Sequence, residues 1–247
     1  MRSTFVIAKR EILSFFASPM AYVVLVVWLV WSGATFWVFC EHYATNLSMG
    51  GSDTPLSMFF GQTILFFLPT LALAPALTMR LVAEETRSGS LEALLTAPVS
   101  DTAIVVGKYI AANVFWASLW APTILYVWLT SRYGDVDLGV VAASYVGILG
   151  IGAYYMAIGL FTSIVSPNQI IAFVLCFLLL GLLFVAGIAS FVLPPDYEDV
   201  AAAFSVWKHM EDFSQGIVDT RYLVFDASLS SLAIFGSIRA LANRRLA

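Results

Sequence analysis

The chain has 247 residues, a net charge of −4 and a composition that is 60 % hydrophobic and only 11 % charged. Soluble domains are typically about 45–50 % apolar and about 25 % charged, so this composition excludes an ordinary water-soluble enzyme or binding domain. Long uncharged runs instead predict an all-α, polytopic membrane protein with six transmembrane helices. We expect a single domain, residues 1–247, with an N-terminal interfacial helix and a short cytoplasmic coupling helix.

Residues 1–20 mix basic and apolar side chains and end near Pro19. This pattern predicts an amphipathic helix that lies at the cytoplasmic interface. A cleaved signal peptide is the alternative interpretation. However, the uncharged run that follows, residues 21–40, is longer than the usual signal core of about 7–15 residues. We therefore expect residues 21–40 to form the first span.

Four further spans follow from the long uncharged runs and are expected at about residues 55–80, 104–131, 138–165 and 169–194. In the last expected span, about residues 222–240, only residues 227–238 are uncharged, and the span is extended back across Asp226. Pro69 and Pro75 should kink or interrupt the second span, because proline removes a backbone donor, and Pro122 makes the third span prone to a kink. The long uncharged run that starts at residue 138 exceeds what one helix needs to cross about 30 Å of hydrocarbon, and the breaker 166–169 divides it.

The segment 196–221, before the last span, is acidic and amphipathic. Its large apolar residues recur at helical spacing: Phe204, Trp207, Met210, Phe213 and Ile217. This predicts one or two short helices on the outer membrane surface. Most basic residues fall near the two termini and in segment 80–108, which favours six spans with both termini in the cytoplasm.

A polar stretch, residues 84–100, separates the second and third spans and becomes the first cytoplasmic loop in this topology. Ser88 or Ser90 is suited to cap a short helix, and Pro98 stops it. Leu91 and its neighbours at positions 94 and 95 share one helical face, which predicts an apolar knob that enters a groove on a soluble partner. The alternative is a solvated connector whose leucines lie against lipid headgroups.

The pattern E-E-x-R-x-G-S-L-E-x-L-L-x-x-P-V-S over residues 84–100, followed by Gly107-Lys108, resembles the coupling-loop signature of ABC exporter permeases of the ABC-2 membrane family. Ser166-Pro167-Asn168-Gln169 and the segment 209–221 resemble parts of the GldF-like, gliding-motility-associated branch. The resemblance extends over nearly the whole chain. It implies a permease subunit that couples ATP hydrolysis by a partner to substrate movement or mechanical work.

The resemblance also implies the partners and their contacts. The partners are a dimer of cytoplasmic ABC ATPases, which bind ATP and Mg, a second permease copy that forms a homodimer, and an auxiliary membrane subunit with a large outer domain. The ATPase contact would involve Glu84, Glu85, Arg87, Gly89, Leu91, Glu92, Leu95 and Pro98. The auxiliary contact would involve Trp207, His209, Phe213, Gly216 and Asp219. The implied location is the bacterial cytoplasmic (inner) membrane.

Other functions have weaker support in the sequence. The chain has two histidines, His42 and His209, without the spacing of a zinc protease, and no glycine-rich phosphate loop, so we expect no catalysis, metal or bound cofactor in this subunit. A passive channel usually places ionisable residues inside its spans, where this chain is mostly apolar. The main alternative is a non-transporting anchor or scaffold for an ATPase complex. The substrate is not indicated, although an apolar interior favours an amphipathic one.

Overall fold

The computed structural model describes residues 2–46, 54–61, 63–96, 98–188 and 204–246, and all regular structure within them is helical. The helices in chain order are α1 (Arg2–Ala17), α2 (Pro19–Asn46), α3 (Pro55–Gly61), α4 (Ile64–Thr78), α5 (Ala83–Ser88), α6 (Ser90–Thr96), α7 (Asp101–Trp120), α8 (Ile124–Thr130), α9 (Leu138–Val165), α10 (Gln169–Ile188), α12 (Val206–Ser214) and α13 (Thr220–Leu246). The short 3₁₀ helix η2 (Ala121–Thr123) joins α7 to α8.

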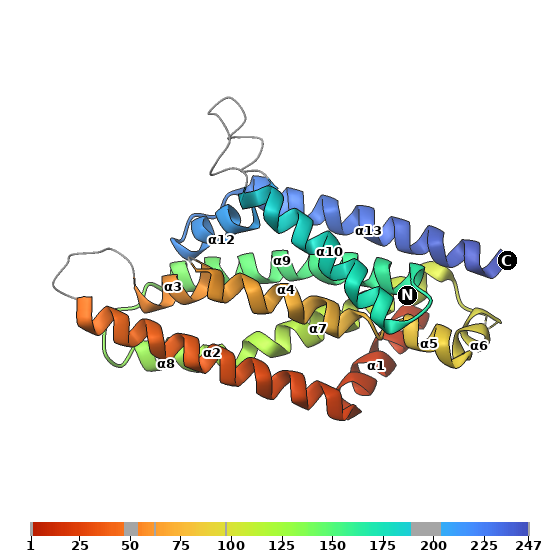
Figure 1. Cartoon of the computed structure of the whole chain (residues 1–247), viewed down its shortest axis with the longest axis horizontal. Helices are drawn as coiled ribbons and strands as arrows, with labels where there is room; N and C mark the ends of the chain where they lie inside the picture. The colour runs from red at the N-terminus through yellow and green to blue at the C-terminus, as the bar shows by residue number, and fades with distance from the viewer. Residues whose placement is uncertain (1, 47–53, 62, 97, 189–203, 247) are drawn as a thin grey trace.

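Within the described residues, six helical segments are long and apolar enough to cross a membrane, which confirms the predicted fold class. They run along the long axis of the molecule, and both chain termini lie at the end that carries α5 and α6 (Figure 1). The short helices α3, α8 and α12 lie at the opposite end (Figure 1). Two spans extend beyond their expected bounds, since α2 continues to Asn46 and α13 to Leu246. Residues 189–194 of the expected fifth span, and residues 196–203 of the outer segment, lie outside the described residues.

The helix of the second span is interrupted, but the interruption does not occur at either of its prolines. The break lies at Thr63, whose backbone is extended between α3 and α4, whereas both expected breakers stay inside α4. Pro69 has no N–H to give to the carbonyl four residues earlier, Leu65. The indole Nε1 of Trp31 donates to that carbonyl instead, at 3.1 Å, so α4 continues past the proline. In the third span Pro122 does interrupt the α-helix, within η2.

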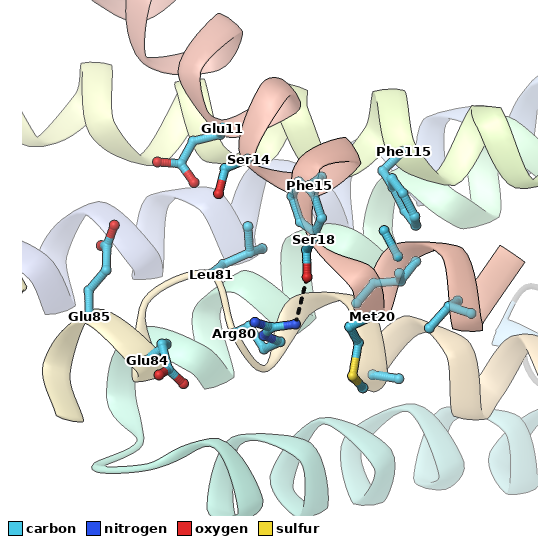
Figure 2. Close-up of a pocket in the computed structure, with 14 residues that line it drawn as sticks. Glu11, Ser14, Phe15, Ser18, Met20, Arg80, Leu81, Glu84, Glu85 and Phe115 are labelled. Atoms are coloured by element: carbon cyan, nitrogen blue, oxygen red, sulfur yellow. Dashed lines mark hydrogen bonds between the residues drawn. The ribbon is translucent and has the colours of Figure 1, made fainter. Parts of the chain in front are cut away.

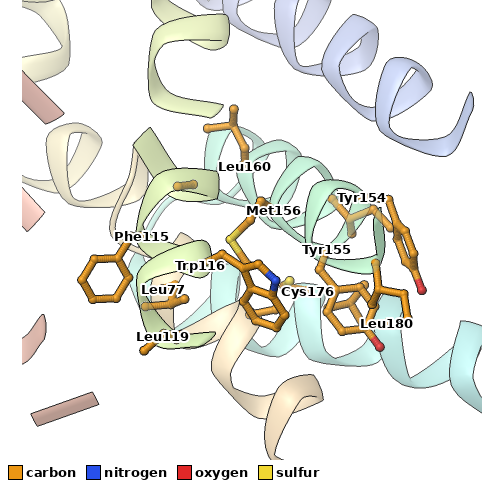
Figure 3. Close-up of a cluster of buried hydrophobic side chains, with 14 of the residues drawn as sticks. Leu77, Phe115, Trp116, Leu119, Tyr154, Tyr155, Met156, Leu160, Cys176 and Leu180 are labelled. Carbon is orange, nitrogen blue, oxygen red and sulfur yellow. The ribbon is translucent and has the colours of Figure 1, made fainter. Parts of the chain in front are cut away.

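Helix α9 forms the centre of the bundle and packs against α4, α7, α10, α12 and α13. Large side chains from α4, α7, α9 and α10 meet in one buried cluster (Figure 3). Its members include Trp116, whose indole donates to the carbonyl of Ile148 at 3.1 Å, and the fully buried Tyr154 and Tyr155. Because bilayer lipid offers no hydrogen-bond partner, the bond to Ile148 satisfies an indole N–H that the membrane cannot.

Candidate functional site

The polar stretch between the second and third spans forms two short helices, α5 and α6, rather than the single helix expected. The joint is Gly89, with a φ of 74° in the left-handed region, where a side chain would be strained. Glycine at this place ends α5 and turns the chain into α6, as glycine commonly does after a helix. We call α5 and α6 together the coupling element. It lies at the same end of the molecule as both termini (Figure 1).

The start of α5 is held by a serine from α9. The first N–H groups of a helix have no partner within the helix, and here Ser163 Oγ accepts from the N–H of Val82 at 3.0 Å and of Ala83 at 3.1 Å. The same hydroxyl donates to the carbonyl of Met79 at 3.1 Å. Ser163 is fully buried, so water does not compete for these bonds. The first turn of the coupling element is thus fixed to the central span.

A buried lysine joins the coupling element to two further helices. Lys108 of α7 is 1 % exposed, and its Nζ donates to the carbonyl of Leu81 at 2.7 Å and to Glu85 Oε1 at 2.8 Å. Its Nζ also lies 3.3 Å from Glu11 Oε1 on α1, and Arg10 Nη2 lies 2.7 Å from that oxygen and 3.8 Å from Glu85 Oε1. The hydrogen bond with Glu11 raises the pKa of Arg10. We call Arg10, Glu11, Glu85 and Lys108 the Lys108 cluster.

The end of α13 holds the coupling element on both sides. Arg244 Nη1 donates to Thr86 Oγ1 of α5 at 3.0 Å, and its Nη2 reaches carbonyls in the turn between α9 and α10. Arg245 Nη2 donates to the carbonyl of Val99 at 3.1 Å and lies 3.2 Å from Asp101 Oδ1. These bonds connect the last span to the residues that precede and follow α6. The C-terminal arginines therefore attach α13 to both flanks of α6.

A pocket of about 190 Å³ opens beside α5, between it and the helices α1, α2, α4 and α7 (Figure 2). The carboxylates of Glu11, Glu84 and Glu85 line it together with the guanidinium of Arg80, which donates to Ser18 Oγ at 3.3 Å. Two of these carboxylates, Glu11 and Glu85, are already paired with Arg10 and Lys108, so the charges that line the pocket are largely balanced.

The residues expected to contact an ATPase divide into two sets. Arg87, Gly89, Glu92 and Pro98 are exposed, and Glu84 is partly exposed with its carboxylate 3.8 Å from Arg87.

Leu91 and Glu85 point into the chain itself instead. Leu91 is only 6 % exposed and belongs to the hydrophobic core, and the carboxylate of Glu85 is engaged by Lys108. The backbone of Leu95 lies in α6, while its side chain lies outside the described part of the chain. The expected apolar knob is therefore not displayed by Leu91 here, because that side chain stabilises the attachment of α6.

Sequence reasoning missed the roles of Ser163, Arg244 and Arg245, and took Lys108 only as part of a motif. The position of Lys108 beside an apolar run could have indicated its role, because a cation that becomes buried there requires a partner. Ser163 carried no signal, since a serine in a span usually bonds to its own helix.

The residues predicted to contact an auxiliary subunit also fall into two sets. His209 and Phe213 of α12 are fully buried, and Trp207 stacks on Phe67 with ring centroids 4.9 Å apart. These three side chains lie on the apolar face of α12, which packs against α3, α9 and α10. Gly216 is exposed in the turn after α12, and Asp219 is partly exposed. A contact with another subunit stays a prediction; Trp207, Gly216 and Asp219 present surface for it in the single chain, whereas His209 and Phe213 do not.

Comparison with known families gives one match. Residues 7–215 match the family described as ABC-2 family transporter protein. The match covers α1, the coupling element and α12 together with five of the six spans. A search of curated proteins found no match.

Proposed function

Because the chain belongs to the ABC-2 family of transporter proteins and is a multi-pass membrane component, we propose that it is the permease subunit of an ATP-driven exporter. The coupling element docks on a cytoplasmic ABC ATPase, which binds ATP and Mg. This chain converts the movement of that partner into movement of its spans. The GldF-like branch, with an auxiliary outer-domain subunit and a second permease copy, completes the proposal.

One observation carries the proposal: α5 is bonded to four other helices at once. Its attachments are Ser163 from α9, Lys108 from α7, Arg10 from α1 and Arg244 from α13. The hydrogen bond between Lys108 and Glu85 joins two charged groups and contributes about 1.5–3 kcal/mol, and two of the four anchors, Ser163 and Lys108, are buried. A force applied to α5 would therefore reach several spans without first breaking its anchors, which is the property that a coupling element requires.

The exposed side chains of the coupling element are suited to polar contacts at the rim of an interface. Glu84, Arg87 and Glu92 present both signs of charge within a few residues. Charged groups at the rim of an interface set the register and the rate of association more than the affinity. We therefore assign partner recognition to these three residues. Leu91 and Glu85 act from inside, by holding α6 and α5 in place.

Co-purification from the native cells in mild detergent tests this function. We expect an ATP-binding subunit to accompany the chain, and the paired reversal Glu84→Lys with Arg87→Glu to reduce its recovery at least tenfold. The matched control is Asp135→Lys with Arg132→Glu in the exposed turn at the other end of the molecule. Equal recovery of the ATPase from both variants would contradict the assignment of the docking surface. Recovery of no ATP-binding subunit with the unchanged chain would contradict the exporter function itself.

A further inference from the structure

The last span contains a buried acid. Asp226 of α13 is 2 % exposed, and its carboxylate accepts no hydrogen bond from any residue that the structure describes. Its Oδ1 lies 3.9 Å from Nδ1 of His209, which is fully buried on α12. Ionisable residues are rare within spans and are typically functional there. The geometry therefore brings together an acid and a base from two helices in an apolar setting.

The surroundings enclose this pair closely. The imidazole of His209 stacks on Tyr222 with ring centroids 4.0 Å apart and meets the edge of Phe225 at 5.7 Å. On the side of α9, a Cβ added at Gly150 would lie 2.8 Å from Asp226 Oδ2. Glycine at this position leaves the space that the carboxylate occupies. The pair is thus covered by aromatic rings on one side and by the backbone of the central helix on the other.

Other titratable groups near the pair do not neutralise it. Those on the packed elements include Tyr145, Tyr154 and Tyr155 on α9, Lys208, Glu211 and Asp212 on α12, and Arg221 and Tyr222 on α13. Both nearby cations have their own carboxylates, since Lys208 Nζ lies 3.3 Å from Asp212 and 3.4 Å from Glu211, and Arg221 Nε lies 3.6 Å from Asp219. Tyr222 donates to Asp212 at 2.6 Å. The phenols of α9 are neutral, and α10 contributes no charged residue.

The charge of the pair depends on the number of protons that it holds. With one proton the pair is neutral overall, with none it carries one negative charge, and with two it carries one positive charge. Burial disfavours both net charges, because isolated ions lose much hydration free energy in an apolar interior. In the one-proton state the proton lies either on the imidazole or on the carboxylate, whose Nδ1 and Oδ1 are 3.9 Å apart.

We propose that His209 and Asp226 form a proton-binding site that holds α12 against the bundle. The site takes one proton from water and keeps it on His209, next to the carboxylate of Asp226. When the proton returns to water, the carboxylate remains buried without a cation, and the contact between α12 and α13 weakens. When a second proton binds to the carboxylate, the imidazolium loses its counter-ion, with the same result. The attachment of α12 is therefore strongest at an intermediate pH.

Histidine NMR in nanodiscs tests the site directly, because the chain has only two histidines. In a His42→Gln background the imidazole signals report His209 alone. We expect His209 to lose its proton at a pH at least one unit higher in this background than in the same chain with Asp226→Asn, a tenfold difference in proton affinity. Asp219→Asn makes the same charge change immediately before α13, outside the pair, and should leave the midpoint unchanged. Equal midpoints with and without Asp226, or an imidazole that stays neutral at every pH, would overturn the proposal.

Hydrogen exchange of the α12 amides supplies the second measurement. We expect their protection factors to pass through a maximum with pH and to fall at least tenfold on either side, whereas Asp226→Asn abolishes this dependence. If Asp226→Asn does not fold, Gly150→Ala replaces it, since the added methyl group displaces the carboxylate and should lower the midpoint of His209. A protection profile that is flat in the unchanged chain, or a midpoint that Gly150→Ala does not move, would overturn the proposal.

Discussion

Replacement of Lys108 by methionine tests the Lys108 cluster. Methionine keeps most of the length of the side chain but removes the ammonium group, which leaves Glu11 and Glu85 without their shared cation. The carbonyl of Leu81 also loses its donor. Because the carboxylate of Glu85 takes part in the attachment of α5, we expect the Lys108→Met variant to unfold more easily and to couple ATP hydrolysis less well.

The structure gives the expected size of this effect. Removing one partner of a buried ion pair destabilises a protein by about 3–5 kcal/mol. The side chains of Glu11 and Glu85 are 12 % and 21 % exposed, so water stabilises them in part after the substitution. We therefore expect a loss of about 2–4 kcal/mol in the free energy of unfolding. For a chain of this size that corresponds to a melting temperature lower by about 4–16 °C.

Melting followed by tryptophan fluorescence in nanodiscs measures this loss. Lys9→Met on α1 is the matched control, because Lys9 is exposed and undergoes the same chemical change. A double-mutant cycle with Glu85→Gln should give an interaction free energy of about 1–3 kcal/mol, as expected for residues in one ion-pair network. A Lys108→Met variant that melts within about 1 °C of the Lys9→Met control would refute this account of the cluster.

Three further predictions address the ends of the molecule. Ser163→Ala leaves two buried N–H groups of α5 without an acceptor and should lower the free energy of unfolding by about 2–4 kcal/mol in the same melting assay, whereas exposed Ser131→Ala should have no effect. Charge reversal at Glu84 and Arg87 should leave the melting temperature unchanged while it weakens recovery of the ATPase, and a fall in both would indicate misfolding instead. Burial opposes the charge of Lys208, but its two carboxylate partners on α12 outweigh it and raise the pKa above the ordinary value. The ion pairs of Lys208 therefore stabilise the folded chain at neutral pH, and this stabilisation is lost as the pH rises through the folded-state pKa of Lys208. After screening by solvent it amounts to less than about 0.5 kcal/mol. The difference in melting between the unchanged chain and Lys208→Met should accordingly vanish in strong alkali, and a difference that grows there would contradict the ion pairs.

The sequence predicts the membrane-spanning architecture well, because uncharged runs and basic loops depend on local composition. The breaker at Ser166 and the 3₁₀ turn at Pro122 follow from backbone chemistry in the same way. The continuation of α4 past Pro69 could not be predicted, since it depends on an indole from another helix that bonds to the freed carbonyl.

The sequence predicted which segment forms the candidate site, but not the directions in which its side chains point. Helical spacing places Leu91 on one face of α6, but it does not say whether that face meets a partner or this chain. The burial of Leu91 and the bond between Glu85 and Lys108 depend on how α1 and α7 pack beside the coupling element. Asp226 can be recognised in the sequence as a single acid in the last span. Its pairing with His209 of α12 can be recognised only in the tertiary structure.

Cross-linking of the coupling element to its partner tests the central claim most directly. In a chain with Cys40→Ser and Cys176→Ala, the exposed residue Ser90 is replaced by cysteine and carries a short photoactivated cross-linker. We expect an adduct with an ATP-binding subunit whose yield changes when ATP is added. The same label at Ser131, exposed at the opposite end of the molecule, should give no such adduct. An ATPase adduct from Ser131, with none from Ser90, would contradict the assignment of α5 and α6 as the coupling element.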